Sequence, residues 1–345
     1  MKINDQQLIS IVLANYNGKK YLKTCLTSVL KSSTKDFEII VIDNNSTDES
    51  VEIINEFAKK DSRIRLFRNK MNMGVPFSRN KAIKKAKGAI LVFLDNDTRV
   101  DRNWLQGISQ AFSKDETIGG MQCKIFDFNK TDMIQEVGMK LYPYTGFGIP
   151  LGRGEKDNGQ FEKEEEIIAL GAALAVRKEV AGKIGGFDLK LKHTTDDLDF
   201  SWRIWIAGYR VVLAPNSKVY HYTKTHNLSN KFYFHLCKNS IRMLIKNYEL
   251  SNTIKYLPFS LILNILGAVS VLFRKGSFAA ILGVLQGFTW SLFFLPDTLR
   301  ERSRVQSLRK ARDKDIFDRI MISTNIFNMY KLYFRTEKTS VALMK

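Results

Sequence analysis

Two acidic clusters in the 345-residue sequence have the residue types and the spacing of a catalytic site. Asp95 and Asp97 lie one residue apart in the segment FLDNDTRV, at the end of the apolar run LVFL. Two carboxylates on an extended turn can face one small volume, and carboxylate oxygens are the ligands that Mg²⁺ and Mn²⁺ share with substrate phosphates. This cluster therefore predicts a divalent-metal site that receives a phosphorylated substrate.

The second cluster is Asp196–Asp197, at the start of a helix that the sequence predicts over residues 196–207. Neighbouring carboxylates that are partly buried raise the pKa of at least one of them, which suits a general base near neutral pH. Acidic residues in a first helical turn also complement the helix dipole, and Asp199 with Arg203 has the spacing of an i,i+4 ion pair. We therefore interpret Asp199–Arg203 as structural and assign chemistry to the pair before it.

Two single residues have one chemical and one structural interpretation each. Asp43 ends the run EIIVID, where its carboxylate could accept N–H bonds from uracil, thymine or guanine. It could equally be a residue at the start of the helix that follows. His221 closes the segment KVYH, either as a satisfied structural group or as a metal ligand beside Asp97.

Short apolar runs and helical patterns alternate over the first hundred residues. The sequence predicts strands at 8–14, 38–43, 64–68 and 89–94, and helices at 19–31, 48–60 and 75–87. The strands are nearly continuous in apolar character, as in a parallel sheet covered by helices on both faces. This is an open, Rossmann-like α/β sheet, in which ligands bind beyond the carboxyl ends of the strands. The polar turns of all four strands converge at that edge.

The following hundred residues are less regular. An acidic run at 162–166 is predicted to be a solvated loop, and a buried strand is predicted at 167–176. After the helix at 196–207, strands are predicted at 210–214 and 218–221.

These segments, taken in order, resemble the inverting glycosyltransferase family 2 with its GT-A fold, over about residues 8–225. The resemblance rests on ISIVLANYNG, IIVIDNNSTDES, NMGVPFSRNKAIKKAKG, FLDNDTRV, ALGAALAVRKEV, IGGFD, TTDDLDFSWRIWIAGYRVVLAP and VYH. It implies transfer of a sugar from a UDP-, dTDP- or GDP-linked donor, with Mn²⁺ or Mg²⁺ as cofactor. Asp43 corresponds to the base-binding aspartate, Asp95 and Asp97 to the metal-binding DxD pair, and His221 to the third metal ligand.

The resemblance also implies the remaining roles. Asp197 occupies the catalytic-base position, and its neighbour Asp196 stays open as the base because the family often has Glu-Asp here. The implied nucleotide-sugar-binding positions are Ala14, Tyr16, Asn17, Asp43, Asn45, Asn72, Gly74, Arg79, Asp95, Asn96 and Gly171. The Gln-x-x-Arg-Trp motif of processive synthases is absent, which favours addition of a single sugar. The GFD and VYH segments and the apolar C-terminal extension are most similar to a rhamnosyltransferase-like branch that acts on lipid-linked saccharides.

Two long, nearly uncharged stretches, 256–273 and 278–299, follow the acidic and histidine motifs. Each is long enough to cross a bilayer, but basic residues flank both ends and occupy the loop between them. A hairpin in the cytoplasmic membrane interface therefore fits better than two spans, and a buried hairpin of a soluble protein is the alternative. The basic segment 300–319 suits anionic lipid headgroups. We predict a catalytic domain at 1–230, with a nucleotide-sugar half at 1–100 and an acceptor half at 101–230, and a membrane-associating helical region at 231–345.

The net charge of +19 attracts polyanions but does not choose among nucleic acid, membrane and phosphorylated substrate. The three cysteines are far apart, which excludes a CxxC zinc site and indicates a reducing compartment, and the N-terminus lacks the apolar core of a signal peptide. A nucleotidyltransferase would be expected to have a glycine-rich phosphate loop near the first strand, and ANYNGKKYL is not such a loop. A nucleic-acid-binding protein would explain the charge, but the sequence contains no recognised nucleic-acid-binding module. A non-catalytic membrane scaffold that binds nucleotide sugar stays an alternative. The expected partners are a nucleotide-sugar donor, a polyprenyl- or dolichyl-linked saccharide acceptor and an anionic membrane surface, with no nucleic acid.

Overall fold

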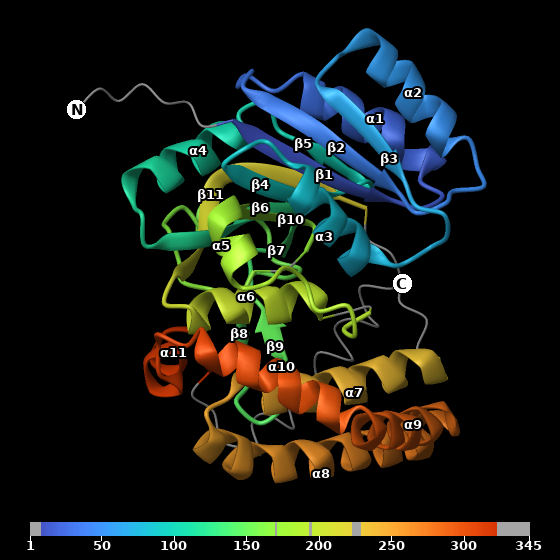
Figure 1. Ribbon diagram of the computed structural model, residues 1–345, viewed down its shortest axis with the longest axis vertical. Coiled ribbons are helices and arrows are strands. Elements are labelled where there is room, and N and C mark those ends of the chain that lie inside the picture. The colour runs from blue at the N-terminus through green and yellow to red at the C-terminus, as the bar shows by residue number, and fades with distance from the viewer. Residues whose placement is uncertain (1–7, 170, 193–194, 223–228, 323–345) are drawn as a thin grey trace. The chain divides into compact units, whose positions relative to one another are not determined.

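The computed structural model describes residues 8–169, 171–192, 195–222 and 229–322 (Figure 1). The chain divides into two compact units. The sheet unit contains Met1–Gly138 and Leu151–Tyr222, and the helical unit contains Met139–Pro150 and Thr223–Lys345.

One nine-stranded sheet forms the centre of the sheet unit, within the ranges that the structure describes. Eight strands follow the order β3-β2-β1-β4-β10-β6-β11-β5, and β7 pairs with β6. The first four strands are parallel, whereas β10 is antiparallel to both of its neighbours. The strands are β1 (Ile9–Asn15), β2 (Phe37–Asp43), β3 (Ile64–Arg68), β4 (Ile90–Asp95), β5 (Thr98–Val100), β6 (Ile118–Asp127), β7 (Ile134–Glu136), β10 (Ala173–Arg177) and β11 (Arg210–His221).

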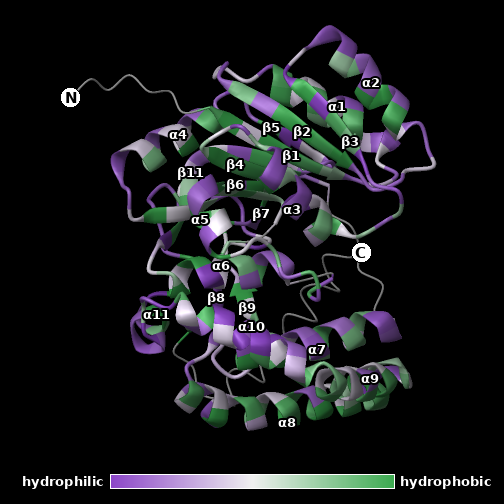
Figure 2. Cartoon of the chain, viewed as in Figure 1, coloured by the Kyte–Doolittle hydropathy of each residue, from purple (hydrophilic) through white to green (hydrophobic). Residues whose placement is uncertain are grey.

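Helices cover both faces of this sheet, which explains why its strands are apolar on both sides (Figures 1 and 2). On one face, α1 (Lys19–Leu30), α2 (Ser50–Lys60) and α4 (Trp104–Lys114) share a hydrophobic core with alternate strand residues such as Ile11 and Val92. On the other face lie α3 (Val75–Lys85), α5 (Lys178–Lys183) and α6 (Asp196–Ile206). There the ring of Phe93 meets the rings of Phe187 and Phe200 edge-on. Asp95, two residues after Phe93, therefore ends its strand on the side of α3 and α6.

The structure departs from the predicted strands in two places. The strand predicted at 167–176 is wrong in its first half. The backbone N–H of Ile167 donates to the carbonyl of Val211, whereas the carbonyl of Ala172 accepts from the N–H of Asp95, so the two halves bond to different parts of the chain. Only Ala173–Arg177 forms a strand. The two strands predicted at 210–214 and 218–221 are one strand, β11, with an irregularity between Ala214 and Lys218.

The helical unit is a bundle with a small two-stranded sheet. Its members are β8 (Met139–Leu141), β9 (Gly148–Pro150), α7 (Asn230–Asn247), α8 (Leu250–Lys275), α9 (Ala279–Phe293), α10 (Leu295–Ser307) and α11 (Asp313–Ile320). Its core includes Tyr233, Cys237 and Val284. A side chain at Gly283 or Gly287 of α9 would collide with α7, so these glycines let the two helices pack closely.

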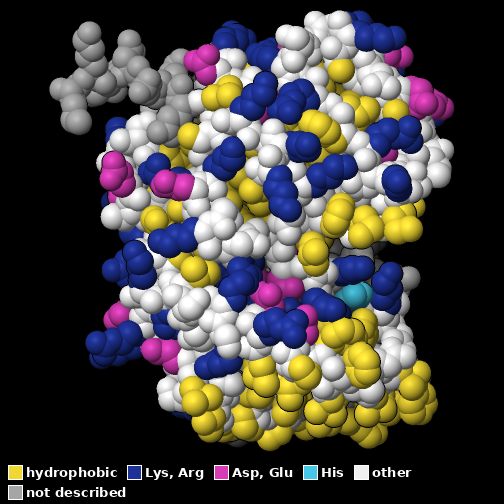
Figure 3. All heavy atoms as spheres, viewed as in Figure 1, with side chains coloured by type: hydrophobic (Ala, Val, Ile, Leu, Met, Phe, Trp, Pro, Cys, Tyr) yellow, Lys and Arg dark blue, Asp and Glu magenta, His cyan; other side chains and the backbone are white. Residues whose placement is uncertain are grey.

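The second apolar stretch, predicted at 278–299, is not one helix. It is divided into α9 and α10, which are bent by 68° at Phe294, and Pro296 occupies the first turn of α10. Among the described residues, α8 is the one helix long and apolar enough to cross a membrane, and the number is two if the bent pair counts as one span. Exposed apolar side chains gather over α8 and α9 (Figure 3). This composition is compatible with membrane association.

Candidate active site

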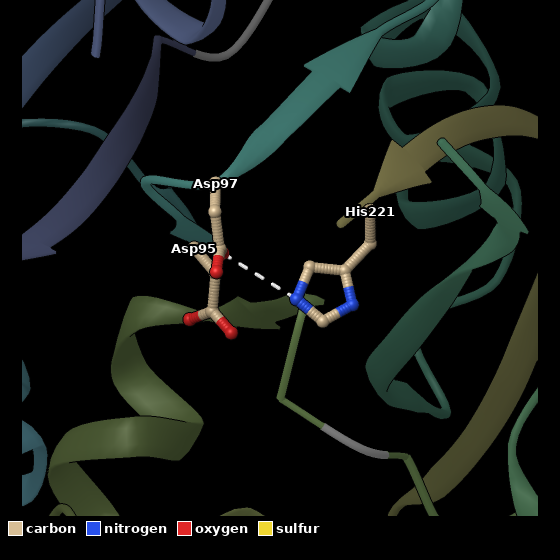
Figure 4. Close-up of side chains that lie close together, drawn as sticks. All are labelled: Asp95, Asp97 and His221. Atoms are coloured by element: carbon tan, nitrogen blue, oxygen red, sulfur yellow. Dashed lines mark ion pairs between the residues drawn. The ribbon is translucent and has the colours of Figure 1, made fainter. Parts of the chain in front are cut away.

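Three potential metal ligands meet beyond the carboxyl end of β4 (Figure 4). Asp95 ends β4, Asp97 lies on the turn into β5, and His221 is the last residue of β11. β5 and β11 pair in register, so that Thr98 lies opposite His221. The ligand atoms of the three residues lie within 4.8 Å of one another, and Nε2 of His221 is 3.4 Å from Oδ1 of Asp97. Residues 126 positions apart in the sequence thus form one cluster.

This cluster has the donor set of a divalent-metal site. Two carboxylates and one imidazole suit Mn²⁺ and Mg²⁺, and their separation leaves each ligand atom within reach of one ion. Burial lowers the pKa of His221, but the hydrogen bond and the charge of Asp97 raise it by more, so the pKa of His221 lies above its usual value. The negative charge of the carboxylates in this cluster therefore favours binding of a proton or a cation.

Arg79, on α3, joins this cluster to the second acidic pair. Its Nη2 atom lies 3.2 Å from Oδ1 of Asp95 and donates to the carbonyl of Gly171, and its Nη1 atom lies 3.2 Å from Oδ2 of Asp196. The side chain is almost fully buried. Burial disfavours its charge, but Asp196 and Asp95 outweigh this effect and raise the pKa of Arg79. A permanent cation therefore lies between the two sets of carboxylates.

Asp196 and Asp197, the first residues of α6, have different environments. Asp196 forms the ion pair with Arg79 and is buried. Burial raises its pKa, and the charge of Arg79 opposes this shift. Asp197 is less buried, and its Oδ1 atom accepts a hydrogen bond from the backbone N–H of Leu198. Burial, followed by the charge of Asp196, raises the pKa of Asp197 to about 7. A carboxyl group with that pKa can take up and release a proton near neutral pH.

Gly171 permits the close approach of Asp197. A Cβ atom at this position would overlap Oδ2 of Asp197 and would lie 3.1 Å from Nη2 of Arg79. Its carbonyl also accepts from Arg79. The glycine predicted from the sequence to line the nucleotide sugar thus lies between the base candidate and the central arginine.

Asp199 and Arg203 form the predicted structural ion pair. Nε of Arg203 lies 2.9 Å from Oδ2 of Asp199, and both side chains are buried. Arg203 also donates to the carbonyl of Ile184. This pair fastens α6 to the segment after α5.

A second polar network lies at the carboxyl ends of β1 and β2. Asp43 is fully buried, and its carboxylate accepts from the side chain of Asn15 at 2.9 Å and from the backbone N–H and the hydroxyl of Ser46. The side-chain oxygen of Asn15 accepts in turn from Asn96. The alternative role of Asp43 at the start of the next helix is wrong, because α2 begins at Ser50. Binding of a nucleobase by Asp43 stays a prediction.

The other predicted donor-binding residues lie around the same sheet edge. Asn17 and Asn45 are, among the described residues, the non-glycine residues with positive φ, at 50° and 66°. Such backbone is uncommon outside glycine and here follows the ends of β1 and β2. Tyr16, Asn45 and Asn72 are exposed, and Ala14 and Asn96 are half-buried. Gly74, with φ of 85°, precedes α3 and donates its N–H to the side chain of Asn72.

Two side chains that contact this machinery were not among the predicted site residues. Asn15 connects the ends of β1, β2 and β4, and its position at a strand end was a signal that could have placed it in the site. Gln135, on β7, lies with Oε1 3.1 Å from Nδ1 of His221. It belongs to the irregular middle of the chain, where the sequence contains no motif.

A family model described as Glycosyl transferase family 2 matches residues 10–185, just over half of the chain. The chain belongs to glycosyl transferase family 2. The family predicted from the sequence is thereby confirmed, and the rhamnosyltransferase-like branch stays a prediction. The match begins in β1 and includes Asp43, Arg79, Asp95 and Asp97.

Two curated relatives match part of the chain. An uncharacterized glycosyltransferase of Haemophilus influenzae is 40% identical over 99 residues, which is 29% of this chain and 40% of the relative. The UDP-Glc:alpha-D-GlcNAc-diphosphoundecaprenol beta-1,3-glucosyltransferase WfaP of Escherichia coli is 42% identical over 91 residues, which is 26% of this chain and 36% of WfaP. The chain thus spans about two fifths of the length of these relatives.

The GT-A fold is confirmed by solved structures. GalNAc-T7, crystallised with UDP, GalNAc and Mn²⁺, superposes with a TM-score of 0.60 over 70% of this chain and 48% of that chain, at 21% identity. The family 2 chain described here therefore has a mixed α/β, GT-A-like sheet with helices on both faces.

Proposed function

We propose that this chain transfers one sugar from a nucleotide-diphosphate sugar to a hydroxyl group of a saccharide acceptor, with inversion at the anomeric carbon. One observation carries the proposal: Arg79 contacts both Asp95 of the metal-ligand cluster and Asp196, the neighbour of the base candidate. A leaving diphosphate and an attacking hydroxyl need these two kinds of group on opposite sides of one sugar. Family membership supports the same reaction class.

Asp197 is the proposed general base. Asp196 forms an ion pair with Arg79, whereas Asp197 forms none with the residues that the structure describes, so Asp197 is the carboxylate better able to accept a proton. With its pKa raised to about 7, it is largely ionised just above neutral pH and accepts the proton of the acceptor hydroxyl as that oxygen attacks the anomeric carbon. Because the attack displaces the diphosphate directly, the configuration inverts.

Asp95, Asp97 and His221 are the proposed ligands of Mn²⁺ or Mg²⁺. A divalent ion bound there would neutralise the charge that develops on the leaving diphosphate. Arg79 holds the Asp95 carboxylate in place for this role, since the arginine is buried and bonded at both ends. The crystallisation of GalNAc-T7 with Mn²⁺ supports a metal of this class.

The β1–β2 network is the proposed nucleotide site. Asp43 and Asn15 hold the turns after β1 and β2 in one arrangement, and Asn17 and Asn45 keep their uncommon backbone there. The exposed ring of Tyr16 and the side chains of Asn72 and Asn96 lie at the same edge. We propose that these residues bind the base, ribose and diphosphate of a UDP-, dTDP- or GDP-linked donor.

The acceptor is proposed to be a polyprenyl- or dolichyl-linked saccharide at the cytoplasmic face of a membrane. WfaP carries a diphosphoundecaprenol-linked acceptor in its name, and α8 of this chain is long and apolar enough to cross a membrane and is mostly not buried. Together they support an enzyme that meets its acceptor at a lipid surface. In this proposal residues 1–230 form the catalytic domain and residues 231–345 the membrane-associating region.

A donor screen tests the proposal. Purified full-length protein is incubated with Mn²⁺, a panel of UDP-, dTDP- and GDP-sugars, and membrane lipid extract as the acceptor source, and release of nucleotide diphosphate is measured. We expect one donor class to give release that requires Mn²⁺ and lipid extract. Binding of nucleotide sugar without release from any donor would instead favour a non-catalytic scaffold.

A further inference from the structure

The side chain of Asn80, on α3, binds the backbone of the turn that precedes α6. Its Nδ2 atom donates to the carbonyl of Phe187 at 2.8 Å, and the N–H of Phe187 donates to its Oδ1 atom at 2.7 Å. The amide thus pairs with both backbone groups of one residue, which requires a donor and an acceptor on the same side chain. A Cβ atom at Gly186, whose φ is 69°, would overlap Oδ1 of Asn80, so glycine lets the turn approach the amide.

The ring of Phe187 packs against both α6 and Arg79. It stacks on the ring of Phe200 in α6, with 4.1 Å between the centroids and 10° between the planes. The guanidinium carbon of Arg79 lies 5.2 Å from the centroid of the Phe187 ring and 5.8 Å from that of Phe93 on β4. Phe187 therefore contacts the helix that begins with the acidic pair and the arginine that binds this pair.

Arg79 needs such support because its side chain is long. The guanidinium is bonded to Asp95 at one side and to Asp196 at the other, each at 3.2 Å. An arginine side chain has many rotamers, and packing against a fixed ring reduces their number. Asn80 directly follows Arg79 in α3, so one helix carries the arginine and the amide that fixes the ring beside it.

We propose that Asn80 is a positioning residue for the transfer reaction: by fixing Phe187, it holds Arg79 between the metal-ligand cluster and the acidic pair. The consequence for turnover rests on the proposed glycosyl transfer. The fixing of the turn concerns the protein alone. Neither Asn80 nor Phe187 is among the site residues predicted from the sequence, and neither has a role in the proposed reaction above.

The charge of Arg79 gives this role a measurable signature at Asp197. Burial raises the pKa of Asp197, the charges of Asp196 on α6 and Glu136 on β7 raise it further, and the charge of Arg79 on α3 lowers it. If Arg79 moves away, the pKa of Asp197 therefore rises. The acid midpoint, the pH at which turnover has fallen by half on the acid side, then moves upward. A variant that only lowers the stability of the fold leaves the acid midpoint unchanged.

The test compares full-length wild type with Asn80→Leu, Phe187→Leu and the double variant. Asn80→Leu removes both hydrogen bonds at similar size, and Phe187→Leu removes the ring but keeps the backbone groups that bind Asn80. Val29→Ala, in the core on the α1 face of the sheet, is the control for lost stability alone. Release of nucleotide diphosphate from the panel of UDP-, dTDP- and GDP-sugars, with Mn²⁺ and lipid extract, is measured against pH. Hydrogen–deuterium exchange of a peptide covering 184–190 reports the turn.

We expect Asn80→Leu and Phe187→Leu each to lose about 10- to 100-fold in turnover and to raise the acid midpoint by about 1 pH unit. Because both act through one ring, the double variant should lose less than the two losses combined. The turn should exchange faster in Asn80→Leu. Val29→Ala should melt at a lower temperature and keep the wild-type acid midpoint and the wild-type exchange of the turn.

An unchanged acid midpoint in Asn80→Leu, or losses that combine fully in the double variant, would overturn the inference. If the wild type turns over no donor, the proposed function fails, and exchange alone decides on the turn. Faster exchange in Asn80→Leu than in Val29→Ala then supports the fixing of the turn by Asn80, and equal exchange overturns it.

Discussion

The two units distribute polarity in opposite ways. In the sheet unit, most strand residues are buried and apolar, and the carboxylates and amides of the candidate site gather at one sheet edge. In the helical unit, α7 buries Lys238, Arg242 and Lys246, while α8 and α9 expose large apolar side chains such as Phe273 and Leu292, which are 84% and 73% exposed. Proteins in water do not normally expose a contiguous apolar face of this kind. The difference is compatible with membrane association of the helical unit.

The basic residues of the segment 300–319 do not all have the same role. Arg302 and Arg309 donate to backbone carbonyls at the end of α7, where cations complement the helix dipole. Arg300, Lys310, Arg312 and Lys314 are exposed. The predicted interaction of this segment with lipid headgroups therefore has fewer candidate residues than the sequence implies.

The largest expected effect of a substitution is at the metal-ligand cluster. Asp97→Ala removes a carboxylate that would hold the ion, and we expect turnover to fall by about three orders of magnitude. His221→Ala should have a smaller effect in the same direction. The measurement is nucleotide diphosphate release over a Mn²⁺ titration, with Asp132→Ala, an exposed surface position, as the control. Turnover of Asp97→Ala within a few fold of wild type would show that the cluster is not the metal site.

A smaller effect is expected at Gly171. The added methyl of Gly171→Ala would displace the Asp197 carboxylate, and a shift of about 1 Å in a reacting group can cost about 100-fold in rate. Gly182→Ala in α5 is the matched control, because a Cβ there meets no atom within 4 Å. Equal turnover numbers for the two variants would mean that Asp197 tolerates displacement and so does not act on the reacting atoms.

The helical unit is tested by placing charge on its apolar face. Ile262→Glu with Leu266→Glu puts two carboxylates on exposed positions of α8, and we expect binding to anionic liposomes to fall about tenfold or more. Release of nucleotide diphosphate with a water-soluble acceptor should stay within about twofold. Met71→Glu, exposed in the sheet unit, is the control in a flotation assay. Unchanged flotation of the α8 variant would assign the apolar face to a protein partner.

Much of the sheet edge was predictable because it depends on local pattern. Apolar runs and the turns after them gave strands within two residues of β1–β4, and therefore placed Asp43 and Asp95 at one edge. Arg79 and Asp196, by contrast, are 117 positions apart, and their contact depends on two helices crossing the same sheet face. Gln135 depends on a bulge, which changes the register by one residue without any sequence signal. The bend between α9 and α10 did have a signal, Pro296, that the apolar composition of the stretch obscured.

The measurement that tests the central claim most directly is the pH dependence of turnover in wild type, Asp197→Asn and Asp196→Asn, with donor binding followed by calorimetry. A base whose pKa is about 7 must be ionised, so wild-type turnover should fall about tenfold per pH unit below 7. Asp197→Asn should bind the donor normally, lose about two to four orders of magnitude in turnover and lose this pH dependence. Since burial raises the pKa of Asp197, its ionised form destabilises the folded protein, and wild type carries this cost above pH 7. The melting temperature of Asp197→Asn above pH 7 should therefore be no lower than that of wild type. If Asp196→Asn is instead the crippling change and Asp197→Asn keeps the wild-type pH profile, Asp197 is not the base and the account of the site is contradicted.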